Sequence, residues 1–141
     1  MADNKEVARR VWEDFRGTGN MELADELLTA DYVGHDSNQP DDVQGPAGAK
    51  EQLSMYRTAF PDMSATVTDQ DEDGDEVTSS WTVTGTNDGE LMGIPPTGKS
   101  QEVSGKTRAR VVDGQVAEEW HEWSQAEMLN QLGIDPSQIQ G

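Results

Sequence analysis

The sequence predicts one α+β domain, in which helices come first and antiparallel strands follow as a curved sheet wrapped by the helices. Two observations support this prediction. Up to Pro61 the apolar residues recur with a helical period, and after it they alternate with a period of two. The length of 141 residues suits a single domain, and no internal repeat or linker divides it. We place the domain at residues 1–133 and expect a loose tail over residues 134–141.

Three helices and a short strand are expected in the first half of the chain. Asp3 and Glu6 have the spacing of a capping box, which marks the start of a helix, and Asn20 can cap a second helix. Pro61 ends the third helix. The expected elements are a helix over residues 3–16, a short helix from residue 20, a strand over residues 31–34 and a helix over about residues 47–59.

Two hairpins and a last helix are expected in the second half. The dipeptide Asp113-Gly114 favours a tight turn, and the acidic stretch 69–76 is expected to be the turn of the first hairpin. Ser124 begins a capping box, so a helix should follow it and end at Gly133. The expected strands are residues 63–68, 77–86, 102–112 and 115–123.

The net charge of the chain argues against some classes of binding partner. Acidic residues number 28 and basic residues 10, which gives a net charge of -18. A field of this sign repels phosphate backbones and anionic lipids, so we expect neither a nucleic-acid nor a membrane partner. Cysteine is absent and no secretory signal is visible, which favours a cytoplasmic protein. An acidic, lysine-poor surface suits a high-salt cytoplasm, so we expect a halophilic source.

The last expected strand carries two different faces. Alternation puts Glu119, His121 and Trp123 on one face and Trp120 on the other. A histidine is suited to proton transfer near neutral pH, and a carboxylate beside it raises its basicity. We therefore take His121 as the candidate catalytic base, assisted by Glu119. The alternative is an exposed histidine in an acidic strand, or a histidine packed on a tryptophan.

The second histidine and one loop suggest the rim of a pocket. His35 precedes Asp36, and the two could form a polar pair at a pocket mouth or a turn in which Asp36 bonds its own backbone. Met92 and Ile94 stand near two prolines, a composition that suits a loop over an apolar cavity. The two histidines lack the close spacing of a metal site, so no metal is expected.

Three segments of the second half carry a family resemblance. They are residues 89–99 (GELMGIPPTGK), 112–120 (VDGQVAEEW) and 129–133 (LNQLG). With Gly45-Pro46 and the Ala-Phe-Pro-Asp run at 59–62, they resemble the SnoaL-like polyketide cyclases, or ester cyclases, of the nuclear transport factor two-like superfamily. The resemblance covers about residues 5–133. It implies a cone-shaped α+β barrel, with a strongly curved antiparallel sheet around an apolar cavity, in a homodimer or homotetramer that buries the Trp120 face.

The resemblance also implies a type of chemistry. Characterised members of the family close a ring by intramolecular aldol condensation, so no metal and no cofactor is expected. Their acid/base group is an aspartate on the last strand, assisted by a histidine on the strand before it. The matching positions here are His121 and Thr107, and a further family aspartate matches Ser124. The proton-transfer pair of the family is therefore not retained as such.

The leading hypothesis is a cofactor-free enzyme of the cyclase or isomerase type that acts on a small apolar carbonyl compound. His121 would remove a proton next to the carbonyl, and a polar partner would bind the developing oxyanion. Two alternatives stay open: a non-catalytic ligand-binding or scaffold protein, and an epoxide or ester hydrolase that uses paired carboxylates, Glu119 among them. The expected substrate-binding residues are Trp123, Thr107, His35, Tyr56, Trp12, Met92 and Ile94, of which Thr107, His35 and Tyr56 are the candidates for the oxyanion.

Overall fold

Helices and strands alternate early in the chain, and strands dominate its second half. The computed structural model describes residues 3–36, 41–91 and 94–134. No helix among them has the length and apolar character of a membrane span. In chain order the elements are α1 (Asn4–Arg10), η1 (Val11–Arg16), α2 (Glu22–Leu27), β1 (Leu28–Asp36), β2 (Val43–Gln44), α3 (Gly45–Ala59), β3 (Ser64–Asp73), β4 (Glu76–Thr86), β5 (Ser100–Val112), β6 (Gln115–Glu122) and α4 (Gln125–Leu132).

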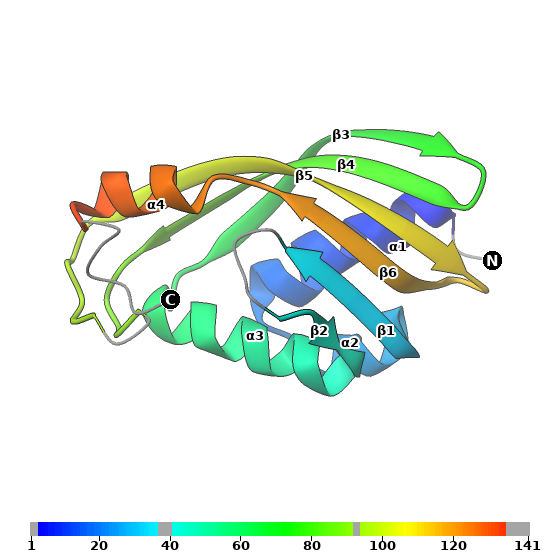
Figure 1. Ribbon diagram of the computed structural model, residues 1–141, viewed down its shortest axis with the longest axis horizontal. Coiled ribbons are helices and arrows are strands. Elements are labelled where there is room, and N and C mark those ends of the chain that lie inside the picture. The colour runs from blue at the N-terminus through cyan, green and yellow to red at the C-terminus, as the bar shows by residue number, and fades with distance from the viewer. Residues whose placement is uncertain (1–2, 37–40, 92–93, 135–141) are drawn as a thin grey trace.

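The strands form one curved, open sheet in the order β2-β1-β6-β5-β4-β3. Helices α1 and α3 lie on one side of it, and the long strands β3, β4 and β5 arch over them (Figure 1). This arrangement confirms the predicted α+β class and the curved sheet wrapped by helices. Neighbouring strands run antiparallel, with one exception to the prediction: β1 and β6 pair in parallel. A parallel pair needs a long crossover, which the chain between these two strands supplies.

The parallel pair makes β1 longer than predicted. The strand was expected over residues 31–34, but it begins at Leu28 and runs on to Asp36. Its pairing with β6 places Gly34 opposite Glu119 and Asp36 opposite His121. Backbone pairing with a distant strand therefore extends β1 beyond its local signal, and it brings the end of β1 beside the candidate base.

The first helix changes type half-way along the predicted range. It is α-helical in α1 and π-helical in η1, where the backbone N–H of Gly17 donates to the carbonyl of Trp12, five residues back. The predicted cap is present, because the Asp3 side chain accepts a backbone N–H at 3.1 Å. The wide turn of η1 carries Trp12, Phe15 and Arg16, all of them buried. Such π-helical turns often occur at functional sites.

The acidic stretch 69–76 is mostly strand, which corrects the prediction of a long turn. β3 runs to Asp73 and β4 begins at Glu76, so that only Gly74 and Asp75 form the turn. The acidic side chains at this tip are mostly exposed, while their backbones keep pairing with β4. Because β4 is rich in good strand formers, this pairing outweighs the low strand propensity of aspartate and glutamate.

The predicted ends of the last hairpin and the last helix are confirmed. Asp113 and Gly114 have positive φ angles of 51° and 79°, as a type I′ turn between β5 and β6 requires. Ser124 caps α4 by accepting a backbone N–H at 3.1 Å, and Gly133 ends it with φ of 74°. Ile134, expected in a loose tail, is instead buried in the core. The rest of that expected tail lies outside the described residues.

Candidate active site

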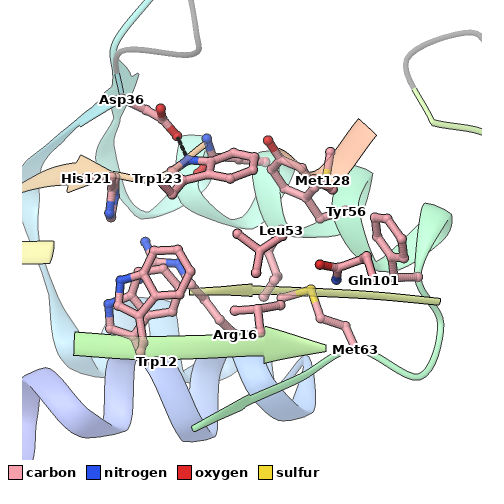
Figure 2. A pocket seen from close by; sticks show the side chains of 15 residues that line it. Trp12, Arg16, Asp36, Leu53, Tyr56, Met63, Gln101, His121, Trp123 and Met128 are labelled. Atoms are coloured by element: carbon pink, nitrogen blue, oxygen red, sulfur yellow. Dashed lines mark hydrogen bonds between the residues drawn. The ribbon is translucent and has the colours of Figure 1, made fainter. Parts of the chain in front are cut away.

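A cavity of about 90 Å³ lies between the curved sheet and the helices. Figure 2 shows the side chains that surround it, which come from η1, α3, α4, several strands and the segments that join them. Most of the lining side chains are apolar or aromatic, as is usual for a small-molecule site with a few placed polar groups. Besides the hydroxyl of Tyr56 and the indoles, the polar or charged lining residues are Arg16, Asp36, Gln52, Gln101 and His121.

His121 points from β6 into this cavity, as the alternation of the strand predicted. Its side chain is 8% exposed. The ring nitrogen Nδ1 lies 2.8 Å from the hydroxyl of Thr107, and that hydroxyl accepts the indole N–H of Trp81 at 2.9 Å. The indole only donates, so the hydroxyl of Thr107 keeps its own proton and can donate it to Nδ1. The neutral ring then carries its own proton on Nε2.

Burial keeps this imidazole neutral. Loss of solvation lowers the pKa of His121 from the ordinary 6.5 to about 4, and it outweighs the opposing charges of Glu119 and Asp36. The Nε2 atom lies 3.8 Å from Glu119 Oε1, which is too long for a hydrogen bond. Thr107, and not Glu119, is therefore the hydrogen-bond partner of the imidazole ring. The ring is a neutral hydrogen-bond donor at neutral pH, with Nε2–H available for a ligand.

Glu119 is held in a buried ion pair behind the cavity and is not among its lining residues. Arg16 donates to both of its carboxylate oxygens, at 2.8 and 3.4 Å, and the hydroxyl of Tyr32 donates at 2.6 Å. Burial on its own would raise the pKa of Glu119, but the charge of Arg16, followed by smaller effects, holds it at about 2. The expected catalytic partner is therefore a fixed anion that positions Arg16. The prediction that Glu119 shares a strand face with His121 is correct. The ion pair could not be predicted from the strand, because Arg16 comes from a helix far away in the sequence.

Asp36 is the carboxylate that the cavity does contain. It ends β1 opposite His121, lines the cavity, and accepts the indole N–H of Trp123 at 2.8 Å (Figure 2). The sequence offered Asp36 only as a turn residue or as the partner of His35. Its real neighbour could not be foreseen, because it depends on the parallel pairing of β1 with β6. One signal in the sequence could have indicated an inward Asp36: with every second residue on the same face of a strand, Asp36 shares its face with Tyr32 and Gly34.

His35 lies on the outer face of the sheet, which differs from its expected place at the pocket. The alternation that turns Asp36 inward turns His35 outward. There it stacks on Trp120, with ring centroids 5.6 Å apart, and its Nε2 lies 2.6 Å from Glu118 Oε2. The hydrogen bond to Glu118 raises the pKa of His35. The Arg108 guanidinium also lies on the Trp120 ring, 4.2 Å from its centroid, and a subunit interface on this face stays a prediction.

The remaining predicted residues divide into three groups. Trp12, Tyr56 and Trp123 line the cavity, and the rings of Tyr56 and Trp123 meet edge to face at 6.5 Å. Ile94 packs against the core and is not a lining residue. Met92 lies outside the described residues. Across residues 3–36, 41–91 and 94–134, no three His, Asp or Glu side chains gather as a metal site would need.

Two buried polar atoms in the cavity wall have no hydrogen-bond partner in the described part of the chain. They are the indole nitrogen Nε1 of Trp12 and the amide oxygen Oε1 of Gln101. Trp12 stacks on Trp81 with ring centroids 4.3 Å apart, and its ring meets that of His121 edge to face at 5.7 Å. Two residues of the cavity wall whose rings are in contact therefore carry donors without a hydrogen-bond partner in the described part of the chain, Trp12 Nε1–H and His121 Nε2–H.

Comparison with known families matches this architecture. The model of the family described as SnoaL-like polyketide cyclase covers residues 6–132. The chain belongs to the SnoaL-like polyketide cyclase family. This confirms the resemblance found in the sequence. No curated protein matches this SnoaL-like chain significantly.

Solved structures show the same fold as this SnoaL-like chain. IdmH of Streptomyces antibioticus, described as a candidate polyketide cyclase, is 29% identical with a TM-score of 0.81, over 94% of this chain and 100% of IdmH. A candidate polyketide cyclase of Acidithiobacillus ferrooxidans is 27% identical with a TM-score of 0.83, over 94% of this chain and 96% of its own. AclR of Streptomyces galilaeus, described as a candidate hydroxylase, is 27% identical with a TM-score of 0.81, over 96% of this chain and 84% of AclR.

Proposed function

We propose that this chain is a cofactor-free enzyme of the cyclase or isomerase type, which removes a proton beside the carbonyl of a small apolar compound. The observation that carries the proposal is a neutral imidazole, fixed by Thr107, that faces the same cavity as the carboxylate of Asp36. A carboxylate and neutral donors inside one apolar chamber are the groups that enolate formation needs. Membership of the SnoaL-like polyketide cyclase family supports the same class of reaction.

The geometry supports a division of roles that differs from the sequence hypothesis. Asp36 takes the proton from the carbon next to the carbonyl. The electron pair of the broken C–H bond forms a C=C bond, and the π pair of the carbonyl moves onto its oxygen. His121 Nε2–H and Trp12 Nε1–H donate to that oxygen. In a cyclase the enolate carbon attacks a second carbonyl of the same molecule, and Asp36 returns its proton to the new alkoxide. In an isomerase Asp36 returns the proton to another carbon of the enolate system. Asp36 is thus the base, and His121 stabilises the oxyanion.

The walls of the cavity strengthen these interactions. Trp12 and Trp81 stack beneath His121, and apolar side chains such as Leu53 and Val103 complete the lining. Excluding water lowers the local dielectric constant, so hydrogen bonds to a developing negative charge gain strength. The hydrolase alternative required Glu119 as a second cavity carboxylate, and the ion pair with Arg16 removes that support.

Exchange of α-protons for deuterium tests the proposal without knowledge of the natural substrate. With 2-tetralone as the probe in D2O, the protein should speed deuterium uptake above the rate with free acetate and imidazole. His121→Phe should lower this rate by about 100-fold, the usual cost of losing one oxyanion donor. The rate should show no inflection near pH 6.5, because burial holds the pKa of His121 at about 4 and the ring stays neutral above it. Proton NMR follows the exchange.

The matched control is His35→Asn, which removes the other imidazole from the outer face and should leave the exchange rate unchanged. Near-ultraviolet circular dichroism checks that both variants fold. A wild-type rate equal to the buffer rate, with 2-tetralone bound, would mean that the chain is a binding protein. An unchanged rate in folded His121→Phe would remove His121 from the mechanism.

A further inference from the structure

A buried amide stands at the end of the cavity away from His121. Gln101 takes an inward position on β5, in alternation with Val103 and Thr107, and it is 5% exposed. Figure 2 shows its side chain turned into the cavity, with Trp12 and His121 at the opposite end. Its oxygen Oε1 has no hydrogen-bond partner in the described part of the chain. A leucine would fill this position without burying a polar atom.

An unpaired buried amide oxygen is unfavourable, so it calls for an explanation. Buried polar side-chain atoms in folded proteins nearly always find a partner, and the exceptions are commonly functional. Gln101 lines the cavity, so a ligand group that reaches its side-chain oxygen can supply the missing donor. The described residues also leave Trp12 Nε1–H unpaired at the other end. A complementary ligand therefore has a hydrogen-bond acceptor near Trp12 and a hydrogen-bond donor near Gln101.

We propose that Gln101 is a specificity-determining residue, whose side-chain oxygen accepts a hydrogen bond from a hydroxyl group of the substrate. The substrate class is then a small, largely apolar hydroxy-carbonyl compound, with its carbonyl at Trp12 and His121 and its hydroxyl at Gln101. The inference rests on the proposed function for the carbonyl end only. The role of Gln101 toward the hydroxyl group concerns binding alone, so it holds whether or not the bound compound reacts.

Discrimination by Gln101 follows from simple hydrogen-bond energetics. A ligand without the hydroxyl leaves the amide oxygen unpaired and dry, whereas a ligand with it satisfies both groups. The wild-type protein should therefore bind a correctly placed hydroxyl compound about tenfold more tightly than its parent. Replacement of the amide by an alkyl group of similar size should abolish that difference, because neither ligand then meets a polar atom at this end.

The test compares 1-tetralone with its 5-, 6- and 7-hydroxy isomers, which place the hydroxyl at different distances from the carbonyl. Dissociation constants from tryptophan fluorescence are measured for the wild type and for Gln101→Leu. At least one isomer should bind about tenfold more tightly than 1-tetralone to the wild type, and Gln101→Leu should bind the two alike. The control Gln131→Leu changes a glutamine that bonds the backbone of Glu102 outside the cavity, and it should keep the preference.

A second readout needs no ligand. Gln101→Leu should raise the Tm of the unliganded protein, because it removes a buried oxygen that nothing pairs. A lower Tm would show that the amide holds the fold, and it would overturn the proposal. So would a wild type that prefers no hydroxy isomer, or a Gln101→Leu protein that keeps the preference. If deuterium exchange is intact but the wild type prefers no hydroxy isomer, or Gln101→Leu keeps the preference, only the role of Gln101 is refuted. If exchange is absent but the wild type prefers a hydroxy isomer and Gln101→Leu does not, only the proposed catalysis is refuted.

Discussion

Arg16→Met should lower the free energy of unfolding by about 3–5 kcal/mol, the usual cost of breaking a buried ion pair from one side. The substitution leaves the carboxylate of Glu119, which is 1% exposed, with Tyr32 as its remaining donor. It also removes the guanidinium that lies 4.3 Å from the Trp12 ring centroid, so the wall of the cavity should loosen. Urea unfolding at constant salt measures the change.

The effect should depend on pH in a defined direction. Because the folded-state pKa of Glu119 is about 2, below the ordinary 4.5, the pair stabilises the protein above pH 4.5 and loses this contribution as the pH falls toward 2. The difference between Arg16→Met and the wild type should therefore shrink in acid. Adding Glu119→Gln to Arg16→Met should recover much of the loss, because the remaining group is neutral and can still accept from Tyr32.

An exposed arginine provides the matched control. Arg10 pairs with Glu26 at 2.9 Å on the surface, and Arg10→Met should cost less than about 1 kcal/mol. If Arg16→Met proved as mild as Arg10→Met, the buried pair would not hold η1 against the sheet, and the placement of Trp12 would need another explanation.

Asp36→Asn should lower the rate of deuterium exchange into 2-tetralone by about 100- to 10,000-fold, the usual contribution of a positioned base. The asparagine keeps the shape of the side chain and can still accept the indole N–H of Trp123, but it cannot take up the proton. Binding of 2-tetralone should change little, so the loss should fall on kcat and leave KM nearly unaltered. Initial rates over a range of probe concentrations separate the two.

The control for Asp36→Asn is Asp42→Asn, at a carboxylate whose Oδ1 lies 3.1 Å from the outward-facing ring of His35. It removes the same charge from the protein without entering the cavity, so the exchange rate should stay at the wild-type value. A folded Asp36→Asn protein that exchanged as fast as the wild type would exclude Asp36 as the base.

Local sequence patterns predicted the site residues that come from the last strand and the first helix. The alternation of β6 put His121 and Trp123 inward, and Trp12 of the first helix, an expected substrate-binding residue, lines the same cavity. The roles of Glu119 and Asp36 could not be predicted in this way. Both depend on contacts across the fold: the η1 turn delivers Arg16 to Glu119, and the parallel register delivers Asp36 to His121.

Gln101 shows a different limit of sequence analysis. Its strand was expected to begin at residue 102, so the glutamine fell outside the alternation that would have marked it as an inward polar residue. The acidic, lysine-poor composition concerns the solvent more than the fold, and the halophilic source that it favours stays a prediction. The curved sheet itself was predictable, because the change of period at Pro61 and the family resemblance agree on it.

The tautomer and charge of His121 decide the account most directly. Nitrogen-15 and proton NMR of the imidazole rings should find the proton of His121 on Nε2, none on Nδ1, and a neutral ring that titrates only near pH 4. His35, whose pKa is raised by Glu118, provides the internal reference. A proton on Nδ1 at neutral pH, or a His121 ring that titrates near 6.5, would contradict the buried donor and the mechanism built on it.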